Sequence, residues 1–320
     1  MPSLEEIRAA ARLIAPVVAP TPQYAWPLLA KRLGIEVWVK HENHTPTGAF
    51  KIRGGLVFID WLTRTHPEVK GVVAATRGNH GQSVTLAARR AGLESVIVVP
   101  HGNSKEKNAA MQAFGAELIV HGEDFQESVE EAGRIAQARG LFAMPSFDLR
   151  LVTGVATYSL EFLSALPDLE TVYVPIGLGS GICGMLTAKA ALGHTVDVVG
   201  VVAEEAPAYA LSLAQGKLVS HPTTTLIGDG MACRTPAPEA LAIIAEGIAR
   251  TVLVSDAEME EAMRAYYSDT HSVAEGAGAA ALAAAMQDAR SGVLEGQQRI
   301  GVVLTGQNVD RDIFARVLAG

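Results

Sequence analysis

The sequence contains little cysteine and no long apolar run, and both absences exclude classes of protein. Only two cysteines, Cys183 and Cys233, occur among 320 residues, so a disulfide-stapled fold is excluded and a reducing compartment is expected. No apolar run reaches the length of a membrane span, and no charged segment before an apolar run marks a signal peptide. We therefore expect a cytoplasmic protein that does not insert into a membrane.

Positive charge is also scarce. The 26 Lys and Arg residues are outnumbered by 34 Asp and Glu residues, which gives a formal net charge of -8. This balance argues against nucleic acid or an anionic membrane as a partner. Any anionic ligand must instead be held by local groups that donate hydrogen bonds.

What the chain does have is enough apolar sequence for large cores. Hydrophobic residues make up 49% of the 320 residues, which suits one or two domains. Strand-like runs are expected at 36–40, 71–74, 96–99, 116–120, 171–174 and 299–304, and helices at 83–92, 104–114, 124–139, 182–192 and 277–286. Such alternation is typical of βαβ units and predicts an α/β fold with parallel sheets. At the amino terminus, Ser3 and Glu6 form a capping box that predicts a further helix.

The first candidate functional segment surrounds Lys51. A strand-like run leads into the turn Pro46-Thr47-Gly48, and Phe50 directly precedes the lysine. A short loop that presents a lysine beside apolar neighbours favours the uncharged amine, which can attack a carbonyl. Taken alone, such a lysine is more often a solvated surface charge.

The second segment is Ala74–Gln82, which contains Thr76-Arg77-Gly78-Asn79-His80 between a strand and a helix. Free N–H groups and the helix dipole at such a turn can bind an anion. Thr76, Asn79 and His80 add side-chain donors. An ordinary βα turn is the alternative interpretation.

The third segment is the glycine-rich turn Gly177-Leu178-Gly179-Ser180-Gly181, again between a strand and a helix. Successive glycines let backbone amides approach a phosphate closely. The same stretch satisfies the dinucleotide fingerprint with Gly179, Gly181 and Gly184, and Asp197 lies downstream at roughly the expected distance. The motif alone therefore leaves two cofactor classes open.

The fourth segment is the strand-like run Arg299–Leu304, which ends at Thr305-Gly306. Ligands in open α/β sheets bind at the carboxyl ends of the strands. A neutral hydroxyl there could hydrogen-bond a pyridine nitrogen. Without the other segments, a plain strand end is the simpler interpretation.

Together the four segments resemble the fold-type II pyridoxal-phosphate enzymes, in the serine/threonine dehydratase and serine racemase branch. The motifs occur in the order found in that family, from about Thr21 to Asn308. The resemblance implies two open, mainly parallel twisted sheets flanked by helices, similar to the tryptophan synthase β fold. It also implies a large pyridoxal-phosphate-binding domain of residues 1–50 and 146–320, with a small mobile domain of residues 51–145 inserted in it.

The resemblance assigns roles to individual residues. It implies that Lys51 is catalytic and carries pyridoxal 5'-phosphate. The expected cofactor-binding residues are Phe50, Lys51, Asn79, Gly177, Leu178, Gly179, Ser180, Gly181, Glu275 and Thr305, and the expected substrate-binding residues are Thr76, Arg77, Gly78, Asn79 and His80. Glu275 enters this set because Glu275-Gly-Ala-Gly-Ala279 resembles the Glu-Pro-Ala-Gly-Ala motif of the family.

The implied activity is β-elimination from a small amino-acid substrate. Dehydration and deamination of threonine or serine would give a 2-oxo acid and ammonia. Other 3-hydroxy amino acids, such as 3-hydroxyaspartate or bulkier ones, and a β-replacement synthase remain alternatives. We also expect a homodimer or other homo-oligomer.

Two departures from the family refine these expectations. Arg77 stands where serine racemase has a serine that acts as the second acid/base, and an arginine stays protonated. Racemisation is therefore not the expected main activity, and Arg77 either contacts a polar substrate group or turns to solvent or a structural carboxylate. Val202 and Ala208 occupy the positions of the family's metal ligands, and neither side chain binds a hard cation. We expect no inherited metal site, although Glu204 and Glu205 lie nearby.

Overall fold

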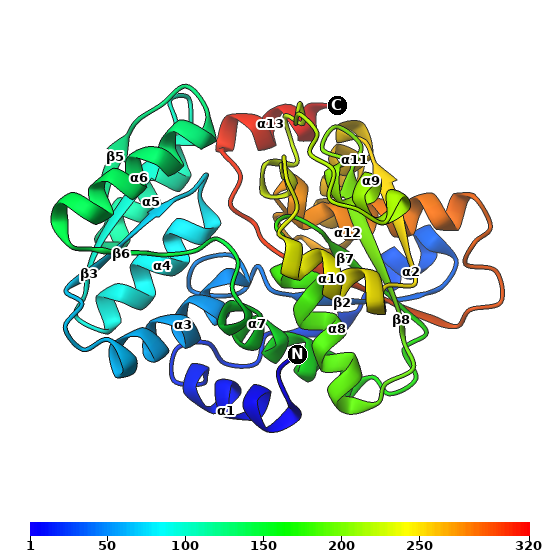
Figure 1. The fold of residues 1–320 in the computed structure, drawn as a ribbon. Helices are drawn as coiled ribbons and strands as arrows, with labels where there is room; N and C mark the ends of the chain where they lie inside the picture. The colour runs from blue at the N-terminus through cyan, green and yellow to red at the C-terminus, as the bar shows by residue number, and fades with distance from the viewer.

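The strands form two separate sheets in the computed structural model, which describes all 320 residues (Figure 1). The larger sheet has six strands in the order β1-β2-β10-β7-β8-β9. Their bounds are Gln23–Ala25 (β1), Glu36–His41 (β2), Arg299–Leu304 (β10), Thr171–Pro175 (β7), Asp197–Ala203 (β8) and Arg250–Val254 (β9). Strand β1 is antiparallel to β2, and every other pair in this sheet is parallel.

The smaller sheet has four strands in the order β5-β4-β3-β6, and all of its pairs are parallel. Their bounds are Glu117–Val120 (β5), Glu94–Val99 (β4), Gly71–Ala75 (β3) and Phe142–Ala143 (β6). Two mainly parallel sheets flanked by helices confirm the predicted α/β fold class. No helix combines the length and apolar character needed to cross a lipid bilayer.

Thirteen α-helices and one short 3-10 turn connect the strands. They are Leu4–Ile14 (α1), Pro27–Leu33 (α2), Lys51–Thr65 (α3), Asn79–Arg90 (α4), Lys105–Phe114 (α5), Phe125–Arg139 (α6), Leu149–Ala165 (α7), Ser180–Leu192 (α8), Ala208–Gln215 (α9), Asp229–Met231 (η1, the 3-10 turn), Pro238–Gly247 (α10), Asp256–Thr270 (α11), Gly276–Arg290 (α12) and Arg311–Ala319 (α13). The predicted capping box is confirmed, because Ser3 and Glu6 bond each other's backbone N–H groups at the start of α1.

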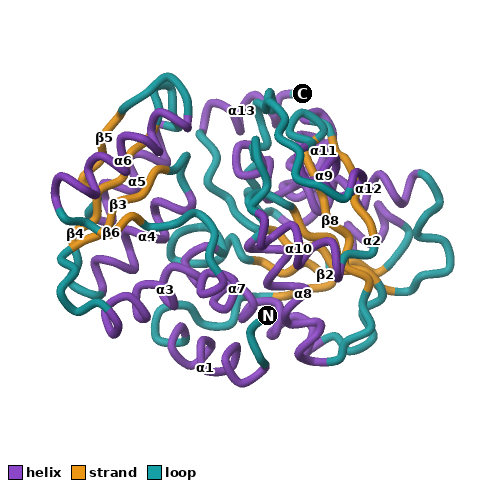
Figure 2. The backbone as a smooth tube through the Cα atoms, in the orientation of Figure 1, coloured by secondary structure: helices purple, strands orange, loops and turns teal.

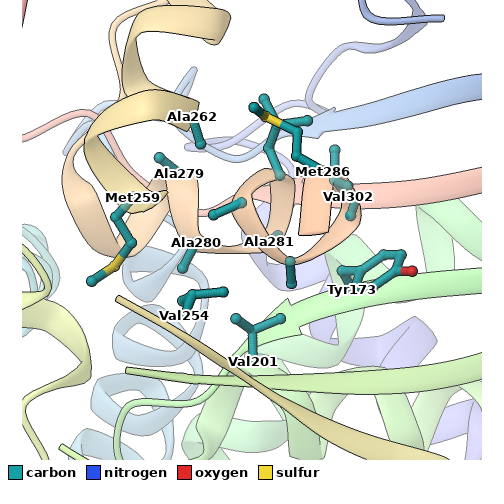
Figure 3. Packing of buried hydrophobic residues seen from close by; sticks show 14 of the residues in the cluster. Tyr173, Val201, Val254, Met259, Ala262, Ala279, Ala280, Ala281, Met286 and Val302 are labelled. Carbon is teal, nitrogen blue, oxygen red and sulfur yellow. The ribbon is translucent and has the colours of Figure 1, made fainter. Parts of the chain in front are cut away.

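Apolar side chains on both faces of the large sheet hold it between helices. Tyr173 packs into the core cluster on one face, while its neighbours Val172 and Val174 pack into the cluster on the other. Figure 3 shows the alanine-rich helix α12 lying against the first face, with Ala280 and Ala281 near strand side chains. Helices α7 and α8 supply apolar side chains to the second cluster. Burial on both faces explains why these strands read as continuous apolar runs.

The small sheet is covered in the same way. Val72 and Ala74 pack with side chains of α3, α4 and α5, while Val73 and Ala75 pack with α6 on the opposite face. Figure 2 shows this group of strands apart from the larger one, with α3 below it and α7 on the side toward the larger group. Helix α7 packs against both α3 and α8, so it joins the two halves of the molecule.

Three helices that border the predicted site begin earlier than the sequence suggested. Lys51 is the first residue of α3 and not part of a loop, while α4 begins at Asn79 and α8 at Ser180. Glycines Gly78 and Gly179 have positive φ angles and turn the chain directly into α4 and α8. The motif residues therefore lie in the first turns of helices.

Candidate active site

A cavity opens at the carboxyl ends of β7 and β10, between helices of the two sheets. Its lining comes from segments far apart in the sequence: Phe50, Lys51, Asn79, Pro175, Gly177, Leu178, Gly179, Ser180, Gly181, Gly230, Met231, Glu275, Ala277 and Thr305. The carboxyl edge of a parallel sheet is where α/β folds bind ligands. The structure therefore places residues from all four sequence segments around this cavity. The second segment contributes only Asn79.

Lys51 projects into this cavity from the first residue of α3. Its side chain is partly exposed because it lines the cavity, and protein atoms otherwise surround it. The Nζ atom lies 4.9 Å from the centre of the Phe50 ring. Burial lowers the pKa of the amine, while the Glu275 carboxylate acts in the opposite sense, and the net pKa is below the ordinary lysine value. The lower pKa makes the uncharged, nucleophilic form of the amine more accessible than it is in a solvent-exposed lysine.

Backbone bonds to the segment after β10 hold Lys51 in place. The Phe50 N–H donates to the Thr305 carbonyl at 3.1 Å, and the Gln307 N–H donates to the Gly48 carbonyl at 2.9 Å. The turn before the lysine is thereby paired with the end of a central strand. This pairing sets Lys51 and Thr305 on the same cavity, although they are 254 residues apart in the numbering.

The glycine-rich turn also lines the cavity. Gly179 has a φ of 107°, in the left-handed region that favours glycine. A Cβ atom at Gly177 would lie 2.3 Å from the carbonyl oxygen of Gly230, so only glycine fits there. The Cys183 N–H bonds the Gly179 carbonyl, and the N–H groups of Ser180 and Gly181 precede this first bond of α8. The turn thus offers free donors at a helix N-terminus, which suits a phosphate.

The position of Asp197 argues against a dinucleotide at this turn. Asp197 pairs in register with Thr171 at the start of β7, whereas the glycine-rich turn follows Pro175 at the end of that strand. Strand rise places these two edges roughly 13 Å apart. Asp197 therefore cannot contact a ribose bound near Gly179, and the dinucleotide interpretation is wrong.

Thr76 organises the loop that precedes α4. Its side chain is buried, and its hydroxyl oxygen accepts hydrogen bonds from the N–H groups of Gly78 at 3.0 Å and Gly81 at 3.3 Å. The hydroxyl oxygen thus accepts within the loop, and its O–H group, which donates to no protein atom, keeps the expected capacity to donate to a ligand. The Gln82 N–H donates the first hydrogen bond of α4, to the Gly78 carbonyl. The backbone N–H of Asn79 therefore has no intrahelical acceptor.

Asn79 connects the first turn of α4 to the other half of the molecule. Its side-chain amide donates to Glu275 Oε1, and its Oδ1 accepts from the amide of Asn308 at 2.8 Å. Asn79 lines the cavity, as Glu275 does. The two hydrogen bonds fix both polar atoms of the Asn79 side chain, and they hold its amide at the cavity.

His80 follows Asn79 but does not line the cavity. Burial lowers the pKa of its imidazole to about 3, and the neighbouring Lys51 charge adds to this effect. The ring is therefore neutral at physiological pH, and its Nε2 atom has no hydrogen-bond partner. A direct contact between His80 and substrate has no support in this geometry.

Arg77 lies at the margin of the site and also does not line the cavity. Its side chain is 43% exposed, and its Nε atom lies 4.0 Å from Asp229 Oδ1. Of the two interpretations left open by the sequence, this arrangement favours the pairing with a structural carboxylate.

Glu275 and Thr305 complete the polar lining. Glu275 is the N-cap residue of α12, and its carboxylate contacts both Asn79 and the ammonium group of Lys107. The Thr305 hydroxyl donates to the Ala277 carbonyl over a long 3.4 Å contact. A bond of this length is weak, so the hydroxyl can turn toward a better acceptor.

Sequence reasoning missed residues that the fold adds to the site. Gly230 and Met231 line the cavity, and Lys107 and Asn308 bond its polar groups. The Asp229-Gly230 pair is a turn signal that could have been noticed. Lys107 carries no such signal, because it lies in a helix that also contains the exposed Lys105.

The lining fits pyridoxal phosphate on three counts. Lys51 supplies a buried amine of lowered pKa, and the first turn of α8 supplies free N–H groups for a phosphate. Thr305 supplies a neutral hydroxyl on the same cavity. No group of three or more His, Cys, Asp or Glu side chains is arranged to hold a metal ion.

Comparisons with known proteins point to the same chemistry. Residues 14–306 match the model of the family described as pyridoxal-phosphate dependent enzymes. The chain is 33% identical to the catabolic L-threonine dehydratase of Escherichia coli (strain K12) over 276 residues, 86% of this chain and 83% of that protein. It is also 33% identical to the L-threonine ammonia-lyase of Thermotoga maritima over 321 residues, 99% of this chain and 78% of that protein.

Solved structures resemble the whole chain. Maize serine racemase superposes with a TM-score of 0.91 at 28% identity, covering 99% of this chain and 97% of that one. The processed form of threonine deaminase isoform 2 from Solanum lycopersicum superposes with a TM-score of 0.89 at 27% identity, covering 100% of this chain and 95% of that one.

Proposed function

This chain belongs to the family of pyridoxal-phosphate dependent enzymes, and we propose that it dehydrates and deaminates a 3-hydroxy amino acid such as threonine or serine. The products are a 2-oxo acid and ammonia. The observation that carries the proposal is the Lys51 amine, which faces the same cavity as the glycine-rich turn and has a lowered pKa. The relatives named L-threonine dehydratase and L-threonine ammonia-lyase, each 33% identical, support the choice of substrate class.

We propose that residues lining the cavity hold the cofactor. Lys51 carries it, the N–H groups of Ser180 and Gly181 bind its phosphate, and Thr305 offers its ring nitrogen a neutral hydroxyl. The proposed cofactor-binding set is Phe50, Lys51, Asn79, Gly177, Leu178, Gly179, Ser180, Gly181, Glu275 and Thr305. When bound, pyridoxal phosphate supplies an electron sink for negative charge at the α-carbon of an amino acid.

The chain's own groups supply orientation and proton transfer. The first turn of α4, with the N–H and side-chain amide of Asn79, binds the substrate carboxylate at a helix N-terminus. Lys51 removes the α-proton and then holds it close to the departing β-hydroxyl. The proposed substrate-binding segment remains Thr76–His80, with its backbone groups and the Thr76 hydroxyl as donors and no contact from the His80 ring.

Arg77 disfavours racemisation. A racemase needs a second acid/base on the opposite face of the substrate, and a guanidinium stays protonated at working pH. Its neighbour Asp229 lies 4.0 Å away and pairs with the guanidinium. This pairing also favours threonine or serine over 3-hydroxyaspartate, because Arg77 already has a carboxylate partner.

We further propose how the protein is organised. Residues 51–145 form a small mobile domain within a large domain of residues 1–50 and 146–320. All strands of the four-stranded sheet lie inside the first range and all strands of the six-stranded sheet lie outside it, which supports the division. We also propose a homodimer or other homo-oligomer that acts in the cytoplasm, where the two free, buried cysteines stay reduced.

The test is a 2-oxo-acid release assay on purified enzyme with pyridoxal phosphate, over serine, threonine, 3-hydroxyaspartate and bulkier 3-hydroxy amino acids of both stereochemistries. We expect release from L-threonine or L-serine together with one equivalent of ammonia. Parallel reactions of serine with sulfide separate elimination from β-replacement. Thioether or thiol amino-acid formation without 2-oxo acid would overturn the proposal.

A further inference from the structure

Lys107 is a buried lysine beside the site that the proposed chemistry does not use. Its side chain is 8% exposed, and its Nζ atom lies 3.1 Å from Glu275 Oε2 and 3.1 Å from Asp229 Oδ2. Burial alone would lower the pKa of this amine, but the two carboxylates outweigh burial and hold the pKa above its ordinary value. Lys107 is therefore a fixed positive charge between two carboxylates.

The surrounding backbone holds Lys107 in this position. Lys107 lies in the first turn of α5, whose N-cap residue Ser104 accepts from the Lys107 N–H at 3.1 Å. The Ser104 hydroxyl donates to Asp310, just before α13. A Cβ atom at Gly78 would lie 2.3 Å from Lys107 Cδ, so the lysine stem packs directly on the loop before α4. The ammonium group thus connects α5 with the segments that carry Glu275 and Asp229.

Glu275 couples this charge to Lys51. The charged and titratable groups around the two lysines are Glu275 at the start of α12, His80 on α4, Asp229 in η1 and Arg77 beside it. Glu275 is the acidic group that acts on Lys51, and it tends to keep that amine protonated. Glu275 Oε2 has no aligned hydrogen-bond donor, so the Lys107 ammonium is the charge that compensates it.

We propose that Lys107 is a positioning residue that neutralises and orients Glu275, so that the Lys51 amine stays free to react with the cofactor. The same contact keeps Glu275 Oε1 available to the Asn79 amide. Without Lys107, a buried carboxylate beside Lys51 is left uncompensated. An opposite charge within a few ångströms raises the pKa of an amine by about one unit or more. This inference rests on the proposed role of Lys51 and not on the identity of the substrate.

The experiment measures capture of pyridoxal phosphate by apoenzyme as a function of pH, followed by the visible absorption of the bound cofactor. In Lys107→Gln, whose amide still donates but carries no charge, we expect the midpoint of capture to move up by about one pH unit. Lys107→Arg restores the charge and should return the midpoint most of the way. Lys105→Met removes an exposed charge from the same helix and should leave the midpoint in place.

A double substitution separates charge compensation from packing. Lys107→Gln in a Glu275→Gln background should shift the midpoint by less than half as much as it does in the parent, because the carboxylate is gone. If Lys107→Gln does not fold, the double variant is compared with Glu275→Gln alone, and a shift of about one pH unit between these two would overturn the proposal. An unchanged midpoint in Lys107→Gln, or an equal shift in both backgrounds, would overturn the proposal.

A separate readout isolates the assignment of Lys51. Borohydride should fix the cofactor on the peptide that contains Lys51, as located by mass spectrometry of the parent enzyme. Fixation on another lysine would refute the role of Lys51 itself, whereas an absent pH shift with fixation on Lys51 refutes only the role of Lys107.

Discussion

The buried ion pairs of Arg53 should control the stability of the helix that carries Lys51. Arg53 lies two residues after Lys51 on α3, and its side chain is 1% exposed. Its guanidinium makes five hydrogen bonds, two each to Glu42 and Glu161 and one to Thr157. Burial alone would lower the pKa of Arg53, but the two carboxylates raise it above its ordinary value. This group therefore stays charged and ties α3 to α7 and to the end of β2.

Arg53→Met should lower the free energy of unfolding by about 3–5 kcal/mol, the usual cost of leaving a buried charge without its partner. The uncompensated group is Glu42, which is fully buried. The Glu161 carboxylate keeps a positively charged partner in the variant, because Lys40 Nζ still lies 2.6 Å from its Oε2 atom. Adding Glu42→Gln to Arg53→Met removes that charge and should recover part of the loss.

Urea unfolding followed by circular dichroism measures these differences. Arg12→Met supplies the control, because Arg12 is 66% exposed and pairs with Glu5 in solvent. The control should leave the unfolding midpoint unchanged within error. If Arg53→Met lowers the free energy of unfolding by less than about 1 kcal/mol, the buried pair of Arg53 and Glu42 does not hold α3. The reasoning from desolvation would then be wrong.

Three further predictions concern the site itself. Lys51→Ala should abolish 2-oxo-acid release in the activity assay while equilibrium dialysis still detects cofactor at the glycine-rich turn; near-wild-type turnover would contradict the role of Lys51. Arg77→Ala should change KM for threonine and for 3-hydroxyaspartate by the same small factor, below about threefold, because Asp229 already pairs with Arg77. A rise in KM confined to 3-hydroxyaspartate would contradict this pairing. Formation of D-serine by the parent enzyme would contradict the argument against racemisation. Chelator treatment should leave activity and thermal stability unchanged, because Val202 and Ala208 offer no oxygen ligands; a loss restored by magnesium or calcium would show that a cation binds elsewhere.

Local sequence was enough to predict the fold class, and the resemblance of its motifs to a known family implied the cofactor. Apolar runs such as 171–174 and 299–304 form central strands, because strands buried on both faces have no polar side. Glycines at 177 and 179 mark the turn before α8, since a positive φ or a close backbone approach leaves a local signature. The boundary between the two proposed domains and the roles of the individual site residues stay predictions, for which the structure provides geometry.

The tertiary structure alone decided which charges meet. Lys107 and Lys105 look alike in the sequence, yet one is buried against Glu275 and the other is exposed, because helix α5 turns one face toward the loops before α12. Arg77 lies in the expected loop, but Asp229 comes to it from a segment 152 residues away in the numbering. Ion pairs across such separations have no local periodicity or spacing, so they depend on how the two sheets and their helices pack together. For the same reason the sequence could indicate a lysine that reacts with a carbonyl, while only the packed structure placed the carboxylate and second lysine that govern its charge.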